Sequence, residues 1–339
     1  MDDRKVKDLG EIELVDEIKR YIDENSKLNP HIILGIGDDA ASVSIPEGYE
    51  MLITCDSMVE GVHFLKDSLS SYEMGRRAAN INISDIGAMG GVPMASLVSL
   101  GLYGDIKVGE IIEIYRGLLE ELRPFNATII GGNITSVYEN ILIDITLFGI
   151  AKKGNIVKRS TAHVDDVILI SGYPGESAAG LWLLKQGKTT DHPLVNRYKL
   201  AQHRAREAHA ISREHLVSSM IDISDGLLLD LYRICKSSKV GAEIFKRNIP
   251  ISSHIREISD EMGEDPLRFI LGKSDDYELI ITCPEANRGR IEEIFKHYSI
   301  PVHHIGQITE KACEISMVDE NGEKHRLEPE GWNHFTAYN

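Results

Sequence analysis

Hydrophobic residues recur every three or four positions in three stretches of the first half of the chain, and short apolar runs separate these stretches. The helical spacing predicts helices over 11–24, 72–90 and 108–123, the last with the most regular apolar stripe. The short runs predict strands at Ile32–Leu34, Met51–Thr54, Leu97–Leu102, Ala127–Ile130 and Ile141–Phe148. This half of the chain is therefore expected to combine helices with a sheet.

The second half shows the same mixture after a polar turn at Lys152–Asn155. We expect helices near 178–184, 196–211, 227–235 and 286–298, and strands at Val167–Ser171, Met220–Asp222, Leu279–Thr282, Val302–Gly306 and Cys313–Val318. A chain of 339 residues is too long for one ordinary core. The patterns thus predict two domains, 1–152 and 153–339, each of the α/β or α+β class.

Composition and charge exclude several kinds of protein. The chain is 42% hydrophobic and 27% charged, as globular proteins are. Its 37 basic and 53 acidic residues give a formal net charge of -16 without any basic run, so neither a nucleic acid nor a membrane surface is an expected partner. No transmembrane or signal-peptide pattern appears. The four cysteines are far apart and form no CxxC pair, so we expect reduced thiols rather than disulfides or a zinc site. This favours a cytoplasmic location.

Acidic side chains come in short clusters near glycine, and these clusters carry the candidate chemistry. Carboxylates repel one another and are costly to bury unpaired, so a pocket that gathers several of them calls for divalent cations. Mg²⁺ prefers oxygen ligands and usually shares them with the phosphates of a substrate. The pattern indicates phosphoryl transfer from a metal-bound nucleotide. The clusters are Gly35–Asp39, Thr54–Asp56, Asn82–Asp85, Asp222–Gly226 and Ser274–Glu278.

Each cluster also has a plain structural interpretation. A capping aspartate in a polar loop would explain Asp38 or Asp39. A helix N-cap would explain Ser224 or Asp225, although it leaves Asp222, in an apolar strand, without a reason. An exposed turn would explain the acidic run that begins at Asp275. The small residues around Gly87–Gly91 indicate either a close helix contact or room for a ligand.

Glycine and basic residues add weaker signals. Gly131-Gly132 follows the strand at Ala127–Ile130 and could be a turn whose amides cradle phosphate, or an ordinary loop turn. Arg159 is a candidate phosphate clamp, and His63 a candidate hydrogen-bonding group. The phosphate-loop and protein-kinase motifs are absent, and Gly172–Gly180 does not match the dinucleotide-binding pattern.

Taken in order, the clusters resemble the thiamine-monophosphate kinase family, which shares a superfamily with aminoimidazole ribonucleotide synthetase, selenophosphate synthetase and a hydrogenase-maturation protein. The resemblance extends from about Gly35 to Phe335. Nine segments carry it: Gly35–Ala40, Asp56–Phe64, Asn82–Gly90, Gly131–Asn133, Arg159-Ser160, Asp222–Leu227, Asp276–Leu279, Ile305-Gly306 and Gly331–Phe335. The second and last segments favour this family over the others of the superfamily.

The resemblance implies a role for each matching position. Positions that match Mg²⁺ ligands are Asp39, Thr54, Cys55, Asp56, Asp85, Asn133, Asp222 and Asp225. Positions that match nucleotide contacts are Tyr115, Gly132, Asn133, Arg159 and Ser224, and those that match acceptor contacts are His63, Asp275 and Trp332. The family fold has two α/β domains: a mixed-sheet N-terminal domain that binds ATP and Mg²⁺ and dimerises, and a C-terminal domain that completes the active site.

The sequence departs from the family pattern at three places. Cys55 stands where a hydroxyl residue is usual, and Asn133 stands where Asp is frequent. The usual Gly-Gly-Glu-Asp-Tyr-Glu segment reads Lys273-Ser-Asp-Asp-Tyr-Glu278, with two glycines lost and Glu shortened to Asp275. This loop bears on the identity of the acceptor.

The expected activity is direct in-line transfer of phosphoryl from ATP to thiamine monophosphate, assisted by several Mg²⁺ ions, with no general base and in a homodimer. Two alternatives stay open. One is a related ATP-dependent enzyme that acts on another phosphorylated or carbonyl acceptor. The other is a non-catalytic nucleotide-binding protein that keeps the fold.

Overall fold

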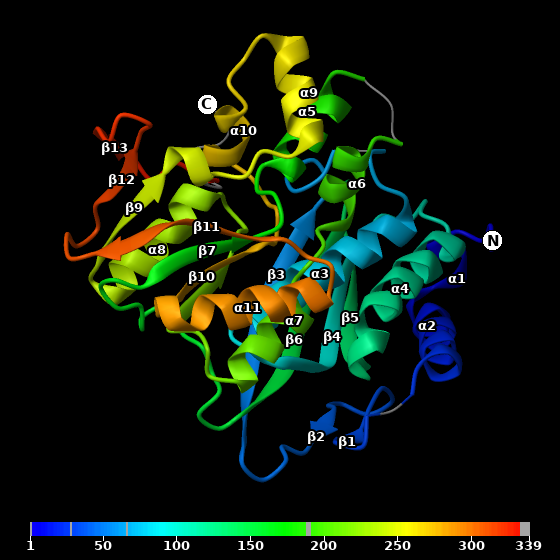
Figure 1. Ribbon diagram of the computed structural model, residues 1–339. Coiled ribbons are helices and arrows are strands. Elements are labelled where there is room, and N and C mark those ends of the chain that lie inside the picture. The colour runs from blue at the N-terminus through cyan, green and yellow to red at the C-terminus, as the bar shows by residue number, and fades with distance from the viewer. Residues whose placement is uncertain (1, 28, 66, 188–190, 333–339) are drawn as a thin grey trace. The chain divides into compact units, whose positions relative to one another are not determined.

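The computed structural model describes residues 2–27, 29–65, 67–187 and 191–332. The chain divides into two compact units. Unit 1 comprises Met1–Ile86 and Gly91–Gly154, and unit 2 comprises Gly87–Gly90 and Asn155–Asn339. Figure 1 colours the elements of both units from blue to red in the order of the chain.

Unit 1 is built on a four-stranded sheet with the strand order β3-β6-β4-β5. β4 and β5 run parallel, whereas β6 pairs antiparallel with both of its neighbours. The helices of this unit are α1 (Val6–Leu9), α2 (Glu11–Asn25), α3 (Ser71–Ala88) and α4 (Val108–Leu122), followed by a 3-10 turn at Arg123–Phe125. The strands are β1 (Ile32–Leu34), β2 (Ser42–Val43), β3 (Tyr49–Val59), β4 (Val92–Leu102), β5 (Thr128–Ser136) and β6 (Leu142–Lys152).

Helices cover one face of this sheet. Along β6, buried and half-buried residues alternate, as expected when only one face is packed. α3 lies on the buried face, where a Cβ added to Gly149 would come within 2.5 Å of the side chain of Ile86. α4 packs tightly against α3, because a Cβ on Gly75 or Gly117 would lie about 2 Å from a backbone carbonyl of the other helix. In Figure 1 the two helices run beside the strands of the sheet.

The opposite side of the sheet is more exposed, and we call it the open face. It presents Ile53, Cys55 and Ser57 of β3, Asp144 and Thr146 of β6, Ser99 of β4 and Asn133 of β5. The short antiparallel pair β1–β2 packs at one end of this face, where Ile32 and Val43 meet Leu97 and Phe148. The loop that joins β1 to β2 carries Asp39, so it is anchored to the open face.

Unit 2 contains a seven-stranded sheet with the order β13-β12-β9-β11-β7-β10-β8. All neighbours pair antiparallel except β12 and β9, which are parallel. The strands are β7 (Val167–Ser171), β8 (Ser219–Asp222), β9 (Gly241–Phe245), β10 (Leu279–Cys283), β11 (Val302–Thr309), β12 (Ile315–Val318) and β13 (Lys324–Leu327). The helices are α5 (Glu176–Lys185), α6 (Pro193–Leu200), α7 (Ala205–Arg213), α8 (Leu227–Ser238), α9 (Ser253–Met262), α10 (Leu267–Leu271) and α11 (Glu285–His297), with a 3-10 turn at Lys246–Asn248.

Both faces of the unit 2 sheet are covered. One core joins Ile168 and Ile170 of β7 to residues of α5, α6, α8, α9 and α10. The other joins Val167 and Leu169 of the same strand to residues of α7 and α11. Every residue of β7 and of β10 is therefore buried, which explains why these segments read as continuous apolar runs.

Most elements expected from the sequence are present, and three of the expectations are wrong in detail. The single helix expected over 196–211 is two helices, α6 and α7, because the chain turns at Ala201, whose φ is 46°. The strand expected at Met51–Thr54 is longer, because β3 continues to Val59 and so contains the whole Thr54–Asp56 cluster. β5 continues through Gly131-Gly132, so the turn expected there is absent from that position. The sequence patterns also missed α1, β2, β9, α9, α10 and β13.

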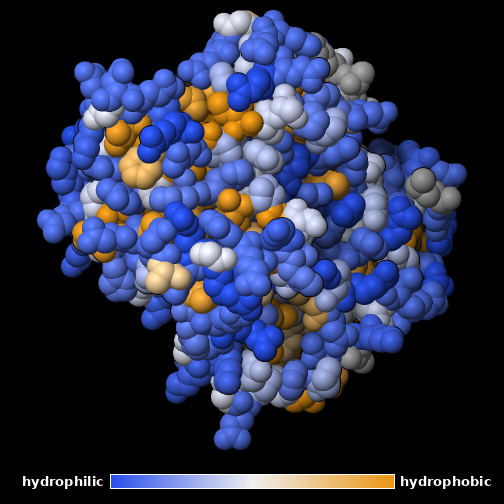
Figure 2. Space-filling view, viewed as in Figure 1, coloured by the Kyte–Doolittle hydropathy of each residue, from blue (hydrophilic) through white to orange (hydrophobic). Residues whose placement is uncertain are grey.

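Hydrophilic residues dominate the surface on the side shown in Figure 2, and apolar residues appear there as separate patches. Among the described residues, no helix is both long enough and apolar enough to cross a membrane.

Candidate functional site

Three of the expected metal ligands meet on the helix-covered face of unit 1. The hydroxyl of Thr54 donates a hydrogen bond to Asp85 Oδ2 at 2.5 Å. The backbone N–H of Asp56 donates to Asn82 Oδ1 at 3.2 Å, and strand alternation places the Asp56 side chain on the same face as Thr54. Because Asn82 and Asp85 are one turn apart on α3, the helix offers both side chains to β3. These contacts form a cluster of oxygen ligands at the edge of the sheet.

Cys55 points to the open face, away from this cluster. Its thiol donates to Asp144, with Sγ 3.5 Å from Oδ1 and 3.8 Å from Oδ2, and it accepts from the hydroxyl of Thr146 at 3.6 Å. The hydroxyl of Ser57 also donates to Asp144. The Cys55 thiol and the Asp56 carboxylate thus lie on opposite faces of β3. Of Cys55, only the main chain is available to the cluster around Asp56.

Gly132 and Asn133 lie in β5, at the edge of the sheet opposite to β3. The expected phosphate-cradling turn at Gly131-Gly132 is wrong, because these residues pair with Leu97 and Val98 of β4. Gly132 is required by close packing, since a Cβ there would lie 1.9 Å from the carbonyl oxygen of Val98. The partner of Asn133 across the ladder is Ser99. Within unit 1, then, the sheet separates Asn133 from Cys55 by two intervening strands.

The other expected residues of unit 1 have contrasting surroundings. Asp39 is exposed, and its N–H donates to Asp38 Oδ1 at 2.8 Å. The backbone of this turn therefore binds the carboxylate of Asp38. His63 Nδ1 accepts from the N–H of Val59 at 3.0 Å, which places the proton of the neutral ring on Nε2. Tyr115 is buried in α4, and burial raises the pKa of its phenol. Its surroundings indicate a packing role, and a nucleotide contact stays a prediction.

In unit 2, the segment Asp222–Gly226 folds around a carboxylate that the sequence patterns did not reveal. Asp230 Oδ2 accepts from the backbone N–H groups of Ser224, Asp225 and Gly226 at 3.0, 3.0 and 3.2 Å. Its other oxygen binds Arg233, which also binds Asp225 Oδ2 at 2.5 Å. Burial raises the pKa of Asp230 to about 6 despite these donors.

The interpretation of Ser224 or Asp225 as an N-cap is wrong. Gly226 is the N-cap of α8, and no side chain caps that helix. With φ at 131° and a Cβ position 2.6 Å from the carbonyl oxygen of Gly272, only glycine fits there. The tight loop holds Ser224 and Asp225 at the end of β8, next to Asp222, which is buried.

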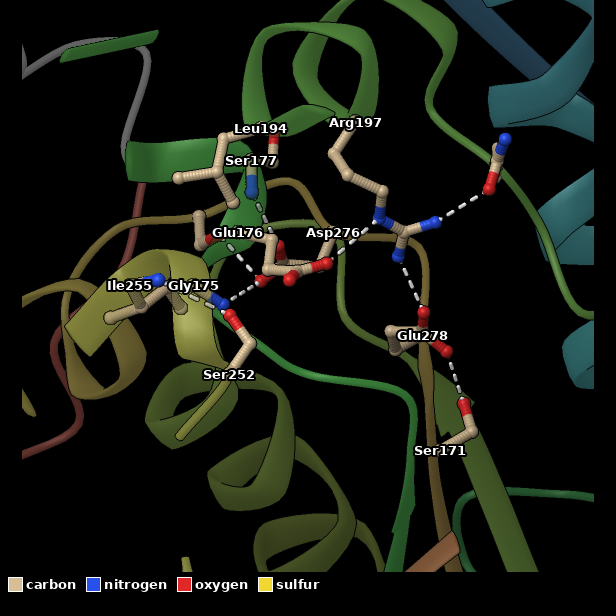
Figure 3. Close-up of polar contacts among 12 residues, drawn as sticks. Ser171, Gly175, Glu176, Ser177, Leu194, Arg197, Ser252, Ile255, Asp276 and Glu278 are labelled. Atoms are coloured by element: carbon tan, nitrogen blue, oxygen red, sulfur yellow. Dashed lines mark hydrogen bonds and ion pairs between the residues drawn. The ribbon is translucent and has the colours of Figure 1, made fainter. Parts of the chain in front are cut away.

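The run from Ser274 to Glu278 is largely buried, so its interpretation as an exposed turn is wrong. Asp276 is bound at the start of α5, where its carboxylate accepts from the N–H of Gly175 at 2.6 Å and the N–H of Ser177 at 2.9 Å. The hydroxyl of Ser274 adds a third bond, at 2.5 Å. Burial raises the pKa of Asp276 to about 6. Figure 3 shows this carboxylate directed at the first turn of α5.

Glu278 is the centre of an ion cluster inside unit 2. It is fully buried, binds Arg204 and Ser171, and forms an ion pair with Arg197 Nη2 at 2.5 Å. Burial opposes its ionisation, but Arg204 and Arg197 outweigh that effect and hold its pKa below the usual value. Arg197 also pairs with Glu176 at 3.4 Å, as Figure 3 shows. These charges are matched by the chain itself, and they join the residue before β10 to α5, α6 and the N-cap of α7.

Unit 2 brings several expected residues into one neighbourhood. The N–H of Tyr277 donates to the carbonyl of Ile223 at 2.8 Å, so the segment with Asp275 runs beside the segment with Asp222. The N–H of Trp332 donates to the carbonyl of Asp225 at 2.9 Å, which ties the last described residues to the same loop. Asn333, His334 and Phe335 of the closing motif lie outside the described residues.

Arg159 is exposed, and no carboxylate in residues 2–27, 29–65, 67–187 or 191–332 forms an ion pair with it. Its backbone carbonyl accepts from the hydroxyl of Ser238 at 2.9 Å, which fixes the local turn. The guanidinium is therefore available to an external anion.

Four residues near these sites were not predicted from the sequence. Asp144 had a signal, because polar residues alternate with isoleucine along β6. Asp230 and Arg233 had none, since an Asp and an Arg three positions apart on a helix are common on solvated faces. Ser177 lies in the glycine-rich segment Gly172–Gly180, which was tested only against the dinucleotide-binding pattern.

Comparison with known proteins identifies relatives of both halves of the chain. The model of the AIR synthase related protein N-terminal domain matches residues 37–151, and that of the C-terminal domain matches residues 163–318. A thiamine-monophosphate kinase from Haemophilus influenzae is 34% identical over 313 residues, covering 91% of this chain and 92% of that protein.

Two solved structures are similar over nearly the whole chain. Thiamine-monophosphate kinase from Stenotrophomonas maltophilia K279a is 27% identical with a TM-score of 0.80, covering 92% of this chain and 96% of that chain. AaThiL complexed with AMPPCP and TMP is 31% identical with a TM-score of 0.75, covering 98% and 99%. These matches confirm the two-domain α/β fold and the resemblance carried by the acidic clusters. The chain belongs to the thiamine-monophosphate kinase family.

Proposed function

We propose that this chain transfers the terminal phosphoryl group of ATP to thiamine monophosphate, forming ADP and thiamine diphosphate. The observation that carries the proposal is the similarity, at 31% identity over 98% of this chain, to AaThiL complexed with AMPPCP and TMP. AMPPCP is an analogue of ATP, and TMP denotes thiamine monophosphate, so both reactants are represented in that complex.

The acceptor is an anion, and this determines what the protein must do. A phosphate oxygen of thiamine monophosphate is already ionised at neutral pH, so no general base is required. The main obstacle is repulsion between two polyanions, and Mg²⁺, when bound, neutralises that charge and aligns the reacting groups. The oxygen ligands around Asp85 fit such an ion, because Thr54 and Asp56 add further oxygen atoms on the same face of β3.

The remaining assignments follow from the match of each position to the family motifs. We assign further Mg²⁺ ligands to Asp39, the main-chain carbonyl of Cys55, Asn133, Asp222 and Asp225. Nucleotide contacts fall to Tyr115, Gly132, Asn133, Arg159 and Ser224, and acceptor contacts to His63, Asp275 and Trp332. The exposed guanidinium of Arg159 suits a phosphate, because it can bind two oxygens at once. Asp222 and Asp225 lie together in unit 2, which supports their joint assignment.

We further propose that the protein is a homodimer formed through the open face of unit 1. Ile53 is 61% exposed on this face, although it lies in the middle of β3. The dimer itself is implied by the resemblance to the family, and the exposed side chain of Ile53 makes this sheet face the candidate interface. A cytoplasmic location stays a prediction from the sequence.

The activity is tested by incubating the protein with ATP, Mg²⁺ and thiamine monophosphate and separating the products by chromatography. We expect thiamine diphosphate and ADP in equal amounts, with neither formed when the acceptor is omitted. ATP binding without thiamine diphosphate would overturn the proposal. ADP formed only with another acceptor would then identify a related enzyme, and no turnover with any acceptor would identify a non-catalytic binding protein.

A further inference from the structure

Two consecutive carboxylates of unit 2 are bound by the same serine. Ser177 is the second residue of α5, and it is 1% exposed. Its backbone N–H donates to Asp276 Oδ1 at 2.9 Å, and its hydroxyl donates to Asp275 Oδ1 at 2.5 Å. A serine hydroxyl has a single hydrogen, so the bond to Asp275 uses its whole capacity as a donor.

The two bonds have different consequences. Asp276 is also bound by Gly175 and Ser274, so the loop is anchored to α5 through several groups at once. Figure 3 shows these anchoring contacts at the first turn of the helix. Asp275, by contrast, is only half-buried. Loss of the Ser177 hydroxyl would leave the bonds to Asp276 in place and remove one donor from the carboxylate of Asp275.

We propose that Ser177 is a positioning residue that orients Asp275 toward the ring end of the acceptor. This inference rests on the proposed function. A carboxylate repels a phosphate, whereas the rings of thiamine carry a positive charge and an amino group, which a carboxylate binds well. Asp275 therefore selects acceptors with a cationic or amine-bearing ring. Asp275 stands where the family usually has the longer Glu, and the bond from Ser177 fixes the direction of this shorter side chain.

The test compares three variants. Ser177→Ala removes the hydroxyl and keeps the N–H that binds Asp276. Ser177→Cys restores a weaker donor of similar shape. Ser252→Ala is the matched control, because Ser252 is a buried serine at the start of α9 whose hydroxyl oxygen accepts from the N–H of Ile255. It makes the same chemical change at another helix start of the same unit, visible in Figure 3.

For Ser177→Ala we expect KM for thiamine monophosphate to rise about tenfold while KM for ATP changes less than about twofold, because one hydrogen bond to a charged group is lost. Ser177→Cys should fall between Ser177→Ala and the unaltered protein. Ser252→Ala should leave both KM values unchanged. Equal changes in both KM values, or an effect of the same size in Ser252→Ala, would indicate a merely structural role and overturn the inference.

Binding of thiamine, measured by calorimetry, separates this inference from the proposed reaction. Thiamine keeps the rings and lacks the phosphate, so Ser177→Ala should weaken its binding by the same factor of about ten. Unchanged thiamine affinity in this variant would overturn the inference even if the protein is an active kinase. If the unaltered protein forms no thiamine diphosphate, the reaction is refuted, while the affinities still decide whether Ser177 acts on the ring end.

Discussion

The Ser274–Glu278 segment of unit 2 and the open face of unit 1 treat their acidic residues in opposite ways. In unit 2, Glu278 is matched by Arg197 and Arg204, and Asp276 by backbone amides. On the open face of unit 1, Asp144 is bound by a hydroxyl and a thiol, and no cation in the described part of the chain pairs with it. Asp39 is exposed beside another carboxylate. An acidic cluster in a sequence can therefore mean a buried structural charge or a place for an external cation, and the surrounding donors distinguish the two.

The largest effect should come from breaking the buried ion cluster. Glu278→Gln leaves two arginines with reduced compensation in a site that is closed to solvent, and we expect the free energy of unfolding to fall by about 3–5 kcal/mol. Urea unfolding followed by circular dichroism measures it. Glu264→Gln, which breaks an exposed pair with Arg268, is the control and should cost less than about 1 kcal/mol. Equal costs in the two variants would show that the buried cluster contributes no more to stability than an exposed ion pair.

A pH dependence should follow from Asp276. Burial raises its pKa from 3.8 to about 6, so between these values the folded state binds more protons than the unfolded state. The stability contributed by this group is then largest below pH 3.8 and falls as pH rises to about 6, by up to about 3 kcal/mol. In Asp276→Asn this decline is absent, so the stability deficit of the variant should shrink as pH rises through that range. Unfolding curves at several pH values measure the difference, and a constant deficit would contradict the account.

The open face offers a test of the proposed dimer. Ile53→Glu places a charge on a surface that we expect another copy to cover, so the dimer should weaken at least tenfold, or about 1.4 kcal/mol. Sedimentation analysis measures the dissociation constant. Ile12→Glu is the control, because Ile12 is 79% exposed on α2 rather than on the sheet. A monomeric unaltered protein, or equal effects of the two variants, would count against the open face as the interface.

The smallest effect is expected at Arg159, an arginine of unit 2 that lies outside the ion cluster around Glu278. Arg159→Ala should raise KM for ATP roughly fivefold to tenfold through loss of one charge-assisted contact, with stability unchanged. Arg197→Ala should lower the stability and leave KM for ATP unchanged, because Arg197 pairs with Glu278 and Glu176. Steady-state kinetics and unfolding curves of both variants measure the two quantities. A loss of stability in Arg159→Ala would show that this guanidinium also serves the fold.

Much of the fold was predictable because periodicity depends on local packing. α2, α3, α4 and α11 appear close to their expected bounds, because their apolar residues recur at helical spacing. The pattern did not reveal that Ala201 interrupts 196–211, because a non-glycine residue with positive φ leaves no mark on hydrophobic spacing. It also missed β13, an edge strand in which three of the four residues are exposed.

The candidate site was predictable only in part. Residue types and order made Asp85 and Asp222 candidates, but the sequence could not show which neighbour neutralises which carboxylate. Asp276 and Glu278 looked like members of an exposed turn, and their amide and arginine partners come from segments about 75 to 100 positions away in the chain. Likewise, Cys55 and Asp56 are adjacent in sequence, yet strand geometry sends their side chains to opposite faces.

The central claim is that the acidic residues around Asp85 serve phosphoryl transfer, whereas those around Glu278 serve stability. The most direct measurement is kcat for thiamine diphosphate formation together with the free energy of unfolding for Asp85→Asn. We predict a fall in kcat of roughly 100-fold or more, since a metal ligand is weakened, with stability changed by less than about 1 kcal/mol. Asp105→Asn, at an exposed aspartate paired with Lys5, should change neither quantity appreciably. An Asp85→Asn protein that keeps full kcat would contradict the account.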